Sequence, residues 1–270
     1  MTYIQRKDGA IYDLEQYGIR TKDFIVSAPS LRHVTEEIEG RDGVVDIETT
    51  EGAREITCLF KMRAVDTADF PLLRNEIFKL FRSKESFYLI DRREPMKRWE
   101  VKCQDAYDIE QKYVYGDFTV TFVCHKGYAE SIGTTLDPFT FDAELWQIGQ
   151  GLAVDDDMVY VHSTPSFKIY NAGDITIDPR VLPLKITFTG ASTNLTITNT
   201  TTGDIWQYTG TTQAGDTITL DGIRALKNSL SIFGNTNRKL ITIAPGWNNF
   251  TITGANGSFT ISFDFRFYYI

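Results

Sequence analysis

The chain has 270 residues, and 42% of them are hydrophobic, which is enough to bury the core of one large or two ordinary domains. Its formal net charge of -8 argues against nucleic-acid binding, because an acidic surface gains nothing from neutralising phosphates. Aromatic residues make up 13% of the chain, which favours β-strands. We expect no signal peptide and no membrane span, since the N-terminus lacks an apolar segment and no apolar run approaches about 18 residues.

The first half of the chain combines strand patterns with one helix pattern. Residues alternate in the two-residue period of a strand through Ile56–Met62, Trp99–Cys103 and Phe118–Cys124. Between the first two runs, Asp66–Ser83 has apolar residues at spacings of three and four, which predicts one amphipathic helix. Candidate N-cap residues are Asp66, Thr67 and Asp69, and the predicted apolar stripe comprises Phe70, Leu73, Ile77, Phe78, Leu80 and Phe81.

The second half contains only strand patterns, which are short and separated by turn signals. In chain order they are Leu184–Phe188, Leu195–Ile197, Ile205–Tyr208, Ile218–Leu220, Leu240–Ile243, Phe250–Ile252 and Phe259–Tyr269. Gly190 is expected to end the first of these strands, and Pro245-Gly246 to form a turn before the sixth. Several strands at this spacing predict an all-β sandwich.

The composition changes near the middle of the chain. Residues 1–135 contain 44 charged side chains and 11 threonines, whereas residues 136–270 contain 20 and 21. We therefore expect two domains, 1–135 and 136–270, although Phe139–Trp146 is apolar enough to pack against either one. The predicted class is mainly β: an N-terminal sheet or sandwich with one packed helix (α+β), followed by a C-terminal all-β sandwich.

The sequence offers no recognisable catalytic set, cofactor motif or metal motif. None of the three histidines, His33, His125 and His162, lies in a nucleophile or metalloprotease motif, and there is no phosphate-binding glycine loop. The acidic run Asp155–Asp157 could attract a hard cation, but no calcium-loop pattern surrounds it, so we interpret it as solvated loop acids. The chain is therefore not expected to be an enzyme or to need a cofactor.

Two further groups of residues have a structural and a functional interpretation. The three cysteines, Cys58, Cys103 and Cys124, lie in apolar strand patterns, so we expect buried free thiols rather than a disulfide or a metal site. The aromatic residues Trp206, Tyr208 and Trp247 could stack against a saccharide. Core packing is the alternative for these aromatic side chains, because a sandwich of this size buries most of its aromatic residues.

An ordered set of turn and strand motifs resembles the distal tail protein (Dit) family of siphophages. These motifs are Ser27–Pro29, Ile38–Gly43, Asn171–Gly173, Gly190, Asn199–Gly203, Leu220–Asp221, Pro245–Asn248 and Ile261–Ile270. Glu39 stands where the family commonly has proline, and the predicted helix lies where the family has one. Gly43 and Gly203 are expected to take positive φ, and Arg41-Asp42 suits a turn or an interface.

This resemblance implies a structural protein of the virion, made in the host cytoplasm and placed at the distal end of the tail. It implies a homohexameric ring with a DNA-passing channel, formed by a tail-tube-like N-terminal domain, with a galectin-like C-terminal domain pointing outward. The implied partners are the tail tube protein, the tape-measure protein, the tail-tip or fibre (Tal) protein and, in some cases, receptor-binding proteins. Two alternatives are a host cell-wall saccharide-binding module and a cell-wall hydrolase.

Overall fold

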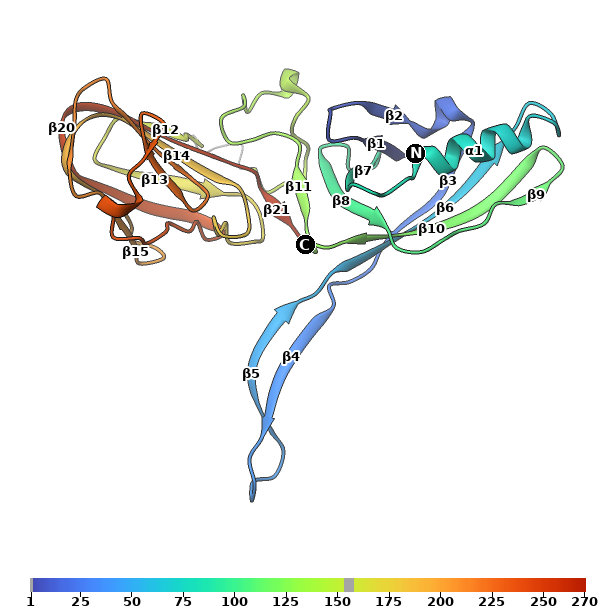
Figure 1. Cartoon of the computed structure of the whole chain (residues 1–270), viewed down its shortest axis with the longest axis horizontal. Helices are drawn as coiled ribbons and strands as arrows, with labels where there is room; N and C mark the ends of the chain where they lie inside the picture. The colour runs from blue at the N-terminus through green and yellow to red at the C-terminus, as the bar shows by residue number, and fades with distance from the viewer. Residues whose placement is uncertain (1, 153–157) are drawn as a thin grey trace. The chain divides into compact units, whose positions relative to one another are not determined.

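The computed structural model describes residues 2–152 and 158–270, which form two compact units. The N-terminal unit is Met1–Glu130 with Ile270, and the C-terminal unit is Ser131–Tyr269. Among the described residues the only α-helix is α1 (Phe70–Leu80), and strands dominate both units (Figure 1), so the mainly β class is confirmed. That helix is too short to cross a bilayer, and no other described helix is long or apolar enough to do so.

The N-terminal unit folds around one continuous path of antiparallel strands. The path is β2-β1-β7-β8-β10-β6-β3, with β9 paired to β10. The strands are β1 (Thr2–Gln5), β2 (Ile11–Asp13), β3 (Ile19–Val26), β6 (Arg54–Arg63), β7 (Phe87–Asp91), β8 (Lys97–Cys103), β9 (Glu110–Lys112), β10 (Tyr115–Cys124) and β11 (Ala129–Ser131). Strands β8 and β10 pair over two residues only. The ring of Phe87 on β7 meets the ring of Phe122 on β10 edge-on, with the ring centres 6.0 Å apart. The three strands predicted in this half are therefore confirmed as parts of β6, β8 and β10.

Helix α1 is shorter than predicted because the turn before it has its own cap. The Asp66 carboxylate accepts hydrogen bonds from the backbone N–H groups of Ala68 and Asp69, so the helix begins only at Phe70. Most of the predicted stripe points inward, but Phe78 is 41% exposed, and its assignment to the stripe was wrong. Phe78 follows the buried Ile77 directly, which turns it about 100° away from the core-facing side.

A long hairpin leaves the body of this unit and was not predicted from the sequence. Strands β4 (Leu31–Glu37) and β5 (Val44–Glu51) pair only with each other (Figure 1). They continue the pairing of β3 with β6, since Ser27 donates to the Glu55 carbonyl and Gly52 to the Ser30 carbonyl. The turn at the tip includes Gly43, whose φ of 84° confirms the expected left-handed conformation.

The C-terminal unit is built on two strands that run through both layers of a sandwich. Its strands are β12 (Val161–His162), β13 (Ser166–Asn171), β14 (Leu184–Asn199), β15 (Asp204–Gln207), β16 (Thr211–Thr212), β17 (Thr217–Asp221), β18 (Arg224–Lys227), β19 (Leu230–Ser231), β20 (Gly246–Phe265) and β21 (Tyr268–Tyr269). The early part of β14 pairs with β17 and the late part of β20, while its late part pairs with β15, β16 and the early part of β20. The two parts of β20 face each other, because the rings of Phe250 and Phe263 lie 4.8 Å apart. The predicted all-β sandwich is confirmed.

Gly190 bends strand β14 and does not end it, contrary to the prediction. The strand continues through φ 154° with shifted register on both sides of Ser192, so the patterns predicted as two strands form one. A Cβ at position 190 would lie 2.7 Å from the Cβ of Phe259 on the paired strand. Glycine is therefore required by the close approach of β20. The runs predicted at Phe250 and Phe259 likewise belong to the single strand β20.

Two other predicted elements differ in the structure. Leu240–Ile243 is not a strand, and only an isolated bridge joins Ile243 to Ile177. The final predicted strand is interrupted at Arg266, which separates β20 from β21. The ambiguous segment near residue 140 packs within the C-terminal unit, where the ring of Trp146 stacks on Phe139 at 4.6 Å and meets Phe267 at 5.8 Å.

Three buried asparagines explain several of the sequence motifs. Asn171, Asn199 and Asn248 are at most 1% exposed. Asn199 donates to the Thr242 carbonyl at 2.8 Å and to Asn248 Oδ1 at 3.1 Å. Asn248 in turn accepts from the Ala244 N–H at 2.9 Å and donates to the Ala244 carbonyl at 2.7 Å. These amides satisfy the backbone of an irregular segment that has no ladder partner, so the motifs are structural locks.

Replacing Asn248 tests this lock. Asn248→Ala should lower the free energy of unfolding by about 1–3 kcal/mol, because buried backbone groups at Ala244 lose their partner. The exposed Asn256, which bonds only to the Thr193 hydroxyl, is the matched control and should change stability by less than about 0.5 kcal/mol as Asn256→Ala. Urea titrations of both variants provide the measurement, and equal losses would contradict the lock.

Candidate functional site

The three aromatic residues predicted as a saccharide platform do not share one surface. Trp206 and Tyr208 are 2% and 7% exposed and belong to the core. Trp247 is half-buried and lies on the other face of the same layer, because its neighbour Asn248 points inward. There Trp247 pairs with Tyr170, whose ring lies 4.9 Å away. The structure therefore divides the predicted set into two core residues and one outward residue.

A narrow cavity lies beside Trp206 in the C-terminal unit. Its apolar lining includes Leu184, Leu220 and Phe233, and Arg238 is among its charged lining residues. The inner space is about 20 Å³, which suits about one water molecule and cannot enclose a sugar ring. This cavity therefore gives no support to a saccharide site at Trp206.

The three histidines occupy separate elements and do not form a site together. His33 lies on the hairpin with Nδ1 2.8 Å from the Thr49 hydroxyl, and His125 lies in the exposed turn after β10. His162 on β12 stacks on the ring of Phe167 at 4.2 Å, and burial lowers its pKa. Across residues 2–152 and 158–270, no three His, Cys, Asp or Glu side chains are grouped as metal ligands would be. Asp155–Asp157 lie outside the described residues.

The cysteines are free thiols, and the expected burial holds for two of the three. Cys58 and Cys124 are buried and Cys103 is half-buried. Burial raises the pKa of all three thiols, which disfavours the reactive thiolate. The thiols therefore serve packing, and Cys103 is the most accessible of them.

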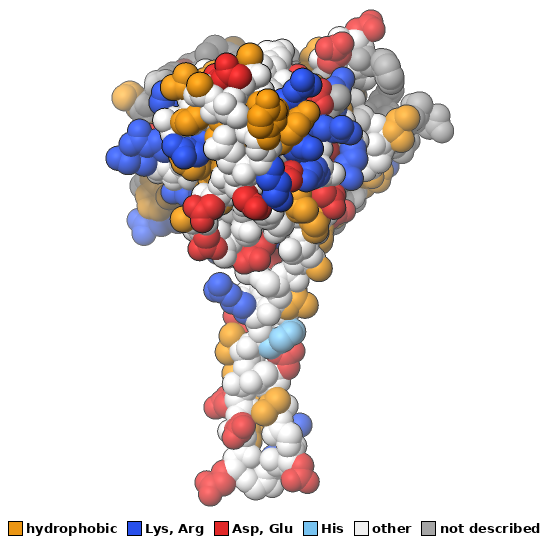
Figure 2. All heavy atoms as spheres, turned by 90° about the vertical axis from the view of Figure 1, so that its right-hand side faces the viewer, with side chains coloured by type: hydrophobic (Ala, Val, Ile, Leu, Met, Phe, Trp, Pro, Cys, Tyr) orange, Lys and Arg blue, Asp and Glu red, His pale blue; other side chains and the backbone are white. Residues whose placement is uncertain are grey.

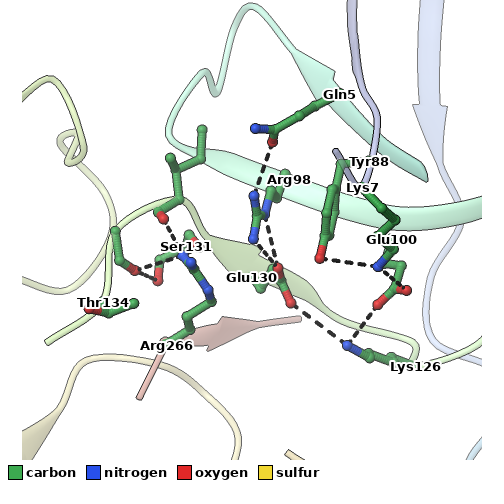
Figure 3. Close-up of polar contacts among 12 residues, drawn as sticks. Gln5, Lys7, Tyr88, Arg98, Glu100, Lys126, Glu130, Ser131, Thr134 and Arg266 are labelled. Atoms are coloured by element: carbon green, nitrogen blue, oxygen red, sulfur yellow. Dashed lines mark hydrogen bonds and ion pairs between the residues drawn. The ribbon is translucent and has the colours of Figure 1, made fainter. Parts of the chain in front are cut away.

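A charged cluster centred on Glu100, in the middle of β8, has its charges paired (Figure 3). The Glu100 carboxylate accepts from Lys7 at 2.5 Å and Ser86 at 2.7 Å and lies 2.8 Å from Lys126. Burial works against ionisation of Glu100, but the hydrogen bonds from Lys126, Lys7 and Ser86 outweigh it and lower the pKa of this carboxyl from 4.5 to about 2. A carboxylate held this firmly in its ionised form is a poor proton acceptor, so the cluster suits a structural role.

A second ion pair in the same unit is almost completely buried. Arg98 and Glu130 are 9% and 5% exposed, and their nearest atoms are 2.7 Å apart. Gln5 accepts from the same guanidinium, which also lies 3.8 Å from the ring centre of Tyr88. Removing one partner would leave an unpaired buried charge, so this pair fixes the geometry of the strands that carry it.

In the C-terminal unit, Arg266 fastens the segment that follows Ser131 (Figure 3). Its guanidinium donates to three consecutive backbone carbonyls, those of Ser131, Ile132 and Gly133. The hydroxyl of Thr135 donates to the Phe263 carbonyl at 2.7 Å. The arginine of the final strand motif thus ties the first residues of the unit to its last strand.

The hairpin presents a group of exposed apolar side chains in the N-terminal unit. Five aliphatic side chains on it are between 48% and 58% exposed. They are Leu31, Val34, Ile38, Val44 and Ile47. A two-stranded hairpin is marginally stable in water by itself, and exposed aliphatic groups mark interaction surfaces. The chemistry of the described surface therefore suits assembly better than catalysis.

Comparison with known proteins agrees with a phage tail protein. Residues 7–124 match the family model described as the phage tail protein RIFT-related domain. The matched residues lie within the N-terminal unit, which is thus similar to this domain.

Solved structures extend the likeness over the whole chain. The Dit protein (gp 19.1) of phage SPP1, described as a paradigm of the hub adsorption apparatus in phages that infect Gram-positive bacteria, has the same fold, with a TM-score of 0.71 and 14% identity. The match covers 99% of each chain. The chain therefore shares the fold of this Dit protein over its whole length, in agreement with the resemblance that the ordered sequence motifs indicated.

Two chains from baseplate structures of phage p2 are less similar to this chain. Its activated baseplate with Sr gives a TM-score of 0.45 at 11% identity over 98% of this chain and 97% of the other. The same baseplate with Ca gives 0.43 at 11% identity over 99% and 98%. The search of curated proteins gives no match to the chain.

The pKa of Glu100 predicts one acid-sensitive contribution to stability. A carboxyl whose pKa is lowered on folding stabilises the fold above pH 4.5, and this stabilisation is lost as the pH falls toward 2. Glu100→Gln should therefore be less stable at neutral pH and should lose less stability between pH 4.5 and 2 than the unmodified chain. Urea unfolding at several pH values tests this. Exposed Glu76 is the control: Glu76→Gln should follow the unmodified pH profile, and a parallel profile for Glu100→Gln would refute the assignment.

Proposed function

We propose that this chain is a distal tail protein, the structural hub that joins the tail tube of a siphophage to its tail tip or baseplate. The observation that carries the proposal is the shared fold with the SPP1 hub protein over 99% of both chains. The phage tail domain at residues 7–124 supports the same role. The function is mechanical: the chain connects other tail proteins and places them at the distal end of the virion.

Six copies form a ring around a channel that passes DNA. The N-terminal unit forms the ring in the manner of a tail tube protein, and the C-terminal sandwich, galectin-like in this proposal, points outward. The net charge of -8 supports passage without retention, since a negative wall repels phosphate. The partners are the tail tube, tape-measure and tail-tip or fibre proteins, with receptor-binding proteins attached in some assemblies.

The role does not include catalysis. The Glu100 carboxylate is paired with lysines, burial raises the pKa of the three thiols, and the histidines are separated. The wall-hydrolase alternative therefore has no chemical support among the described residues.

The ring is tested by the mass of the purified protein. Light scattering should give about six times the 30.7 kDa mass of one chain, and negative-stain images should show rings with a central opening. A sample that stays monomeric at every concentration, with and without tail tube protein, would overturn the ring. A closed ring with another number of copies would support the proposed hub and contradict the hexamer.

A second candidate function rests on Trp247. Its ring lies on the outward face beside Tyr170, and the Lys168 ammonium lies 5.7 Å from the ring centre. Adjacent outward aromatic rings can stack on the apolar face of a sugar. The C-terminal unit would then hold a host cell-wall saccharide while the ring is assembled.

A glycan array with purified protein tests this second candidate. Trp247→Ala should weaken any saccharide binding about three- to tenfold, because one stacked ring is lost. Tyr113→Ala, which removes a 76% exposed aromatic ring from the other unit, should leave binding unchanged. Absence of binding to every cell-wall polysaccharide, or equal losses in both variants, would exclude the site.

A further inference from the structure

The hairpin formed by β4 and β5 carries a concentrated negative charge. Residues 31–51 contain seven acidic and two basic side chains, a net charge of -5. The acidic residues are Glu36, Glu37, Glu39, Asp42, Asp46, Glu48 and Glu51. They lie on both faces of the hairpin among exposed aliphatic side chains, and Figure 2 shows red side chains along its length. A partner for this hairpin must offer positive charge together with apolar surface.

A surface of that chemistry lies on the same unit, at the far end of the strands that lead to the hairpin. We call it the basic end, and it comprises Arg20, Lys22, Lys61, Arg63, Lys112 and Tyr115. Strand register places these residues on the outward face, since Tyr115 pairs with Arg63 on one side and Lys112 on the other, and Arg20 pairs with Lys61. Figure 2 shows blue side chains on the body above the hairpin, together with red and orange ones.

The basic end keeps an excess of positive charge after its own ion pairs are counted. Lys22 is paired with Asp117 at 2.5 Å and Lys112 with Glu110 at 3.3 Å. The five cations thus face two carboxylates on this surface. The Lys61 ammonium lies 4.4 Å from the ring centre of Tyr115, which leaves a half-exposed aromatic surface beside the charges. Charge and apolar character therefore both complement the hairpin.

The hairpin cannot reach the basic end of its own chain. Strand β5 leads into β6 at Arg54, whereas Lys61 and Arg63 lie at the other end of that ten-residue strand, about 30 Å away. The hairpin points away from the body because β3 and β6 continue their pairing into it (Figure 1). A second molecule is the source of the complementary surface.

We propose that the acidic hairpin of each chain docks on the basic end of a second copy. This contact is heterologous, since two different surfaces meet, and a repeated heterologous contact produces a closed ring or an open filament. The inference rests on the proposed ring and specifies how neighbouring copies recognise each other. Opposite charges at the contact orient the two copies and raise their rate of association. The aliphatic and aromatic groups provide the apolar surface that is buried between them.

Charge reversal on each side, and on both together, tests the contact in the full chain. Replacing Glu36, Glu37, Glu39 and Glu48 by lysine changes the charge of the hairpin from -5 to +3. Replacing Arg20, Arg63 and Lys112 by glutamate changes the charge of the basic end from +3 to -3. Each set should weaken self-association at least about tenfold, because like charges then face each other. The variant that combines both sets should recover most of the assembly, since the two surfaces again have opposite charge. Sedimentation velocity over a concentration series gives the dissociation constants.

A matched control uses the C-terminal unit. Replacing Lys185, Arg224 and Lys239 by glutamate makes the same change in net charge as the basic-end variant, on exposed side chains outside both surfaces, and should leave assembly unchanged. Circular dichroism in the near ultraviolet shows whether each variant keeps its packing. Raising the salt from about 0.1 M to about 1 M shortens the Debye length from about 10 Å to about 3 Å. The assembly of the unmodified chain should therefore weaken at high salt, because the opposite charges are screened from each other.

The outcomes separate this inference from the proposed function. Recovery of assembly in the combined variant supports the contact. Rings that persist unchanged in both charge-reversed variants overturn the hairpin contact and leave the proposed ring standing. A chain that never assembles overturns both. If a reversed hairpin fails to fold, replacement of residues 28–52 by a short glycine turn provides a second variant, which should be a folded monomer.

Discussion

The antiparallel pairing of β3 with β6 is the constraint on which the N-terminal unit depends. Its register sends Cys58 and Phe60 into the core and leaves Lys61 and Arg63 on the outer face. The same ladder of backbone hydrogen bonds runs on into the hairpin, which has no core of its own. One structural device therefore stabilises the body and also fixes two surfaces of opposite charge at opposite ends of the unit.

Sequence periodicity predicted the elements that have one buried and one exposed face. Strands β6, β8, β10 and the two sandwich layers were found because burial alternates along them. The hairpin was missed because both of its faces are exposed, so its apolar residues follow no period. Gly190 was read as a strand end because glycine also marks bends and close approaches, and only the opposite Phe259 distinguishes these.

The candidate site was less predictable from the sequence than the fold. Trp206 and Tyr208 follow an inward period, and core packing was the correct interpretation of them. The outward position of Trp247 depends on the burial of Asn248, a polar residue that no hydrophobicity pattern would place in a core. The motifs that indicated the family carry these buried amides and the Arg266 clamp, so they report on the closure of the sandwich rather than on a binding site.

The passage of β14 and β20 through both layers has a consequence for how the C-terminal unit melts. In a sandwich whose layers have separate strands, one layer can loosen while the other persists. Here a local opening that releases β14 removes a member of both layers at once, and with it the opposed rings of Phe250 and Phe263. We therefore expect the sandwich to unfold as a single cooperative unit.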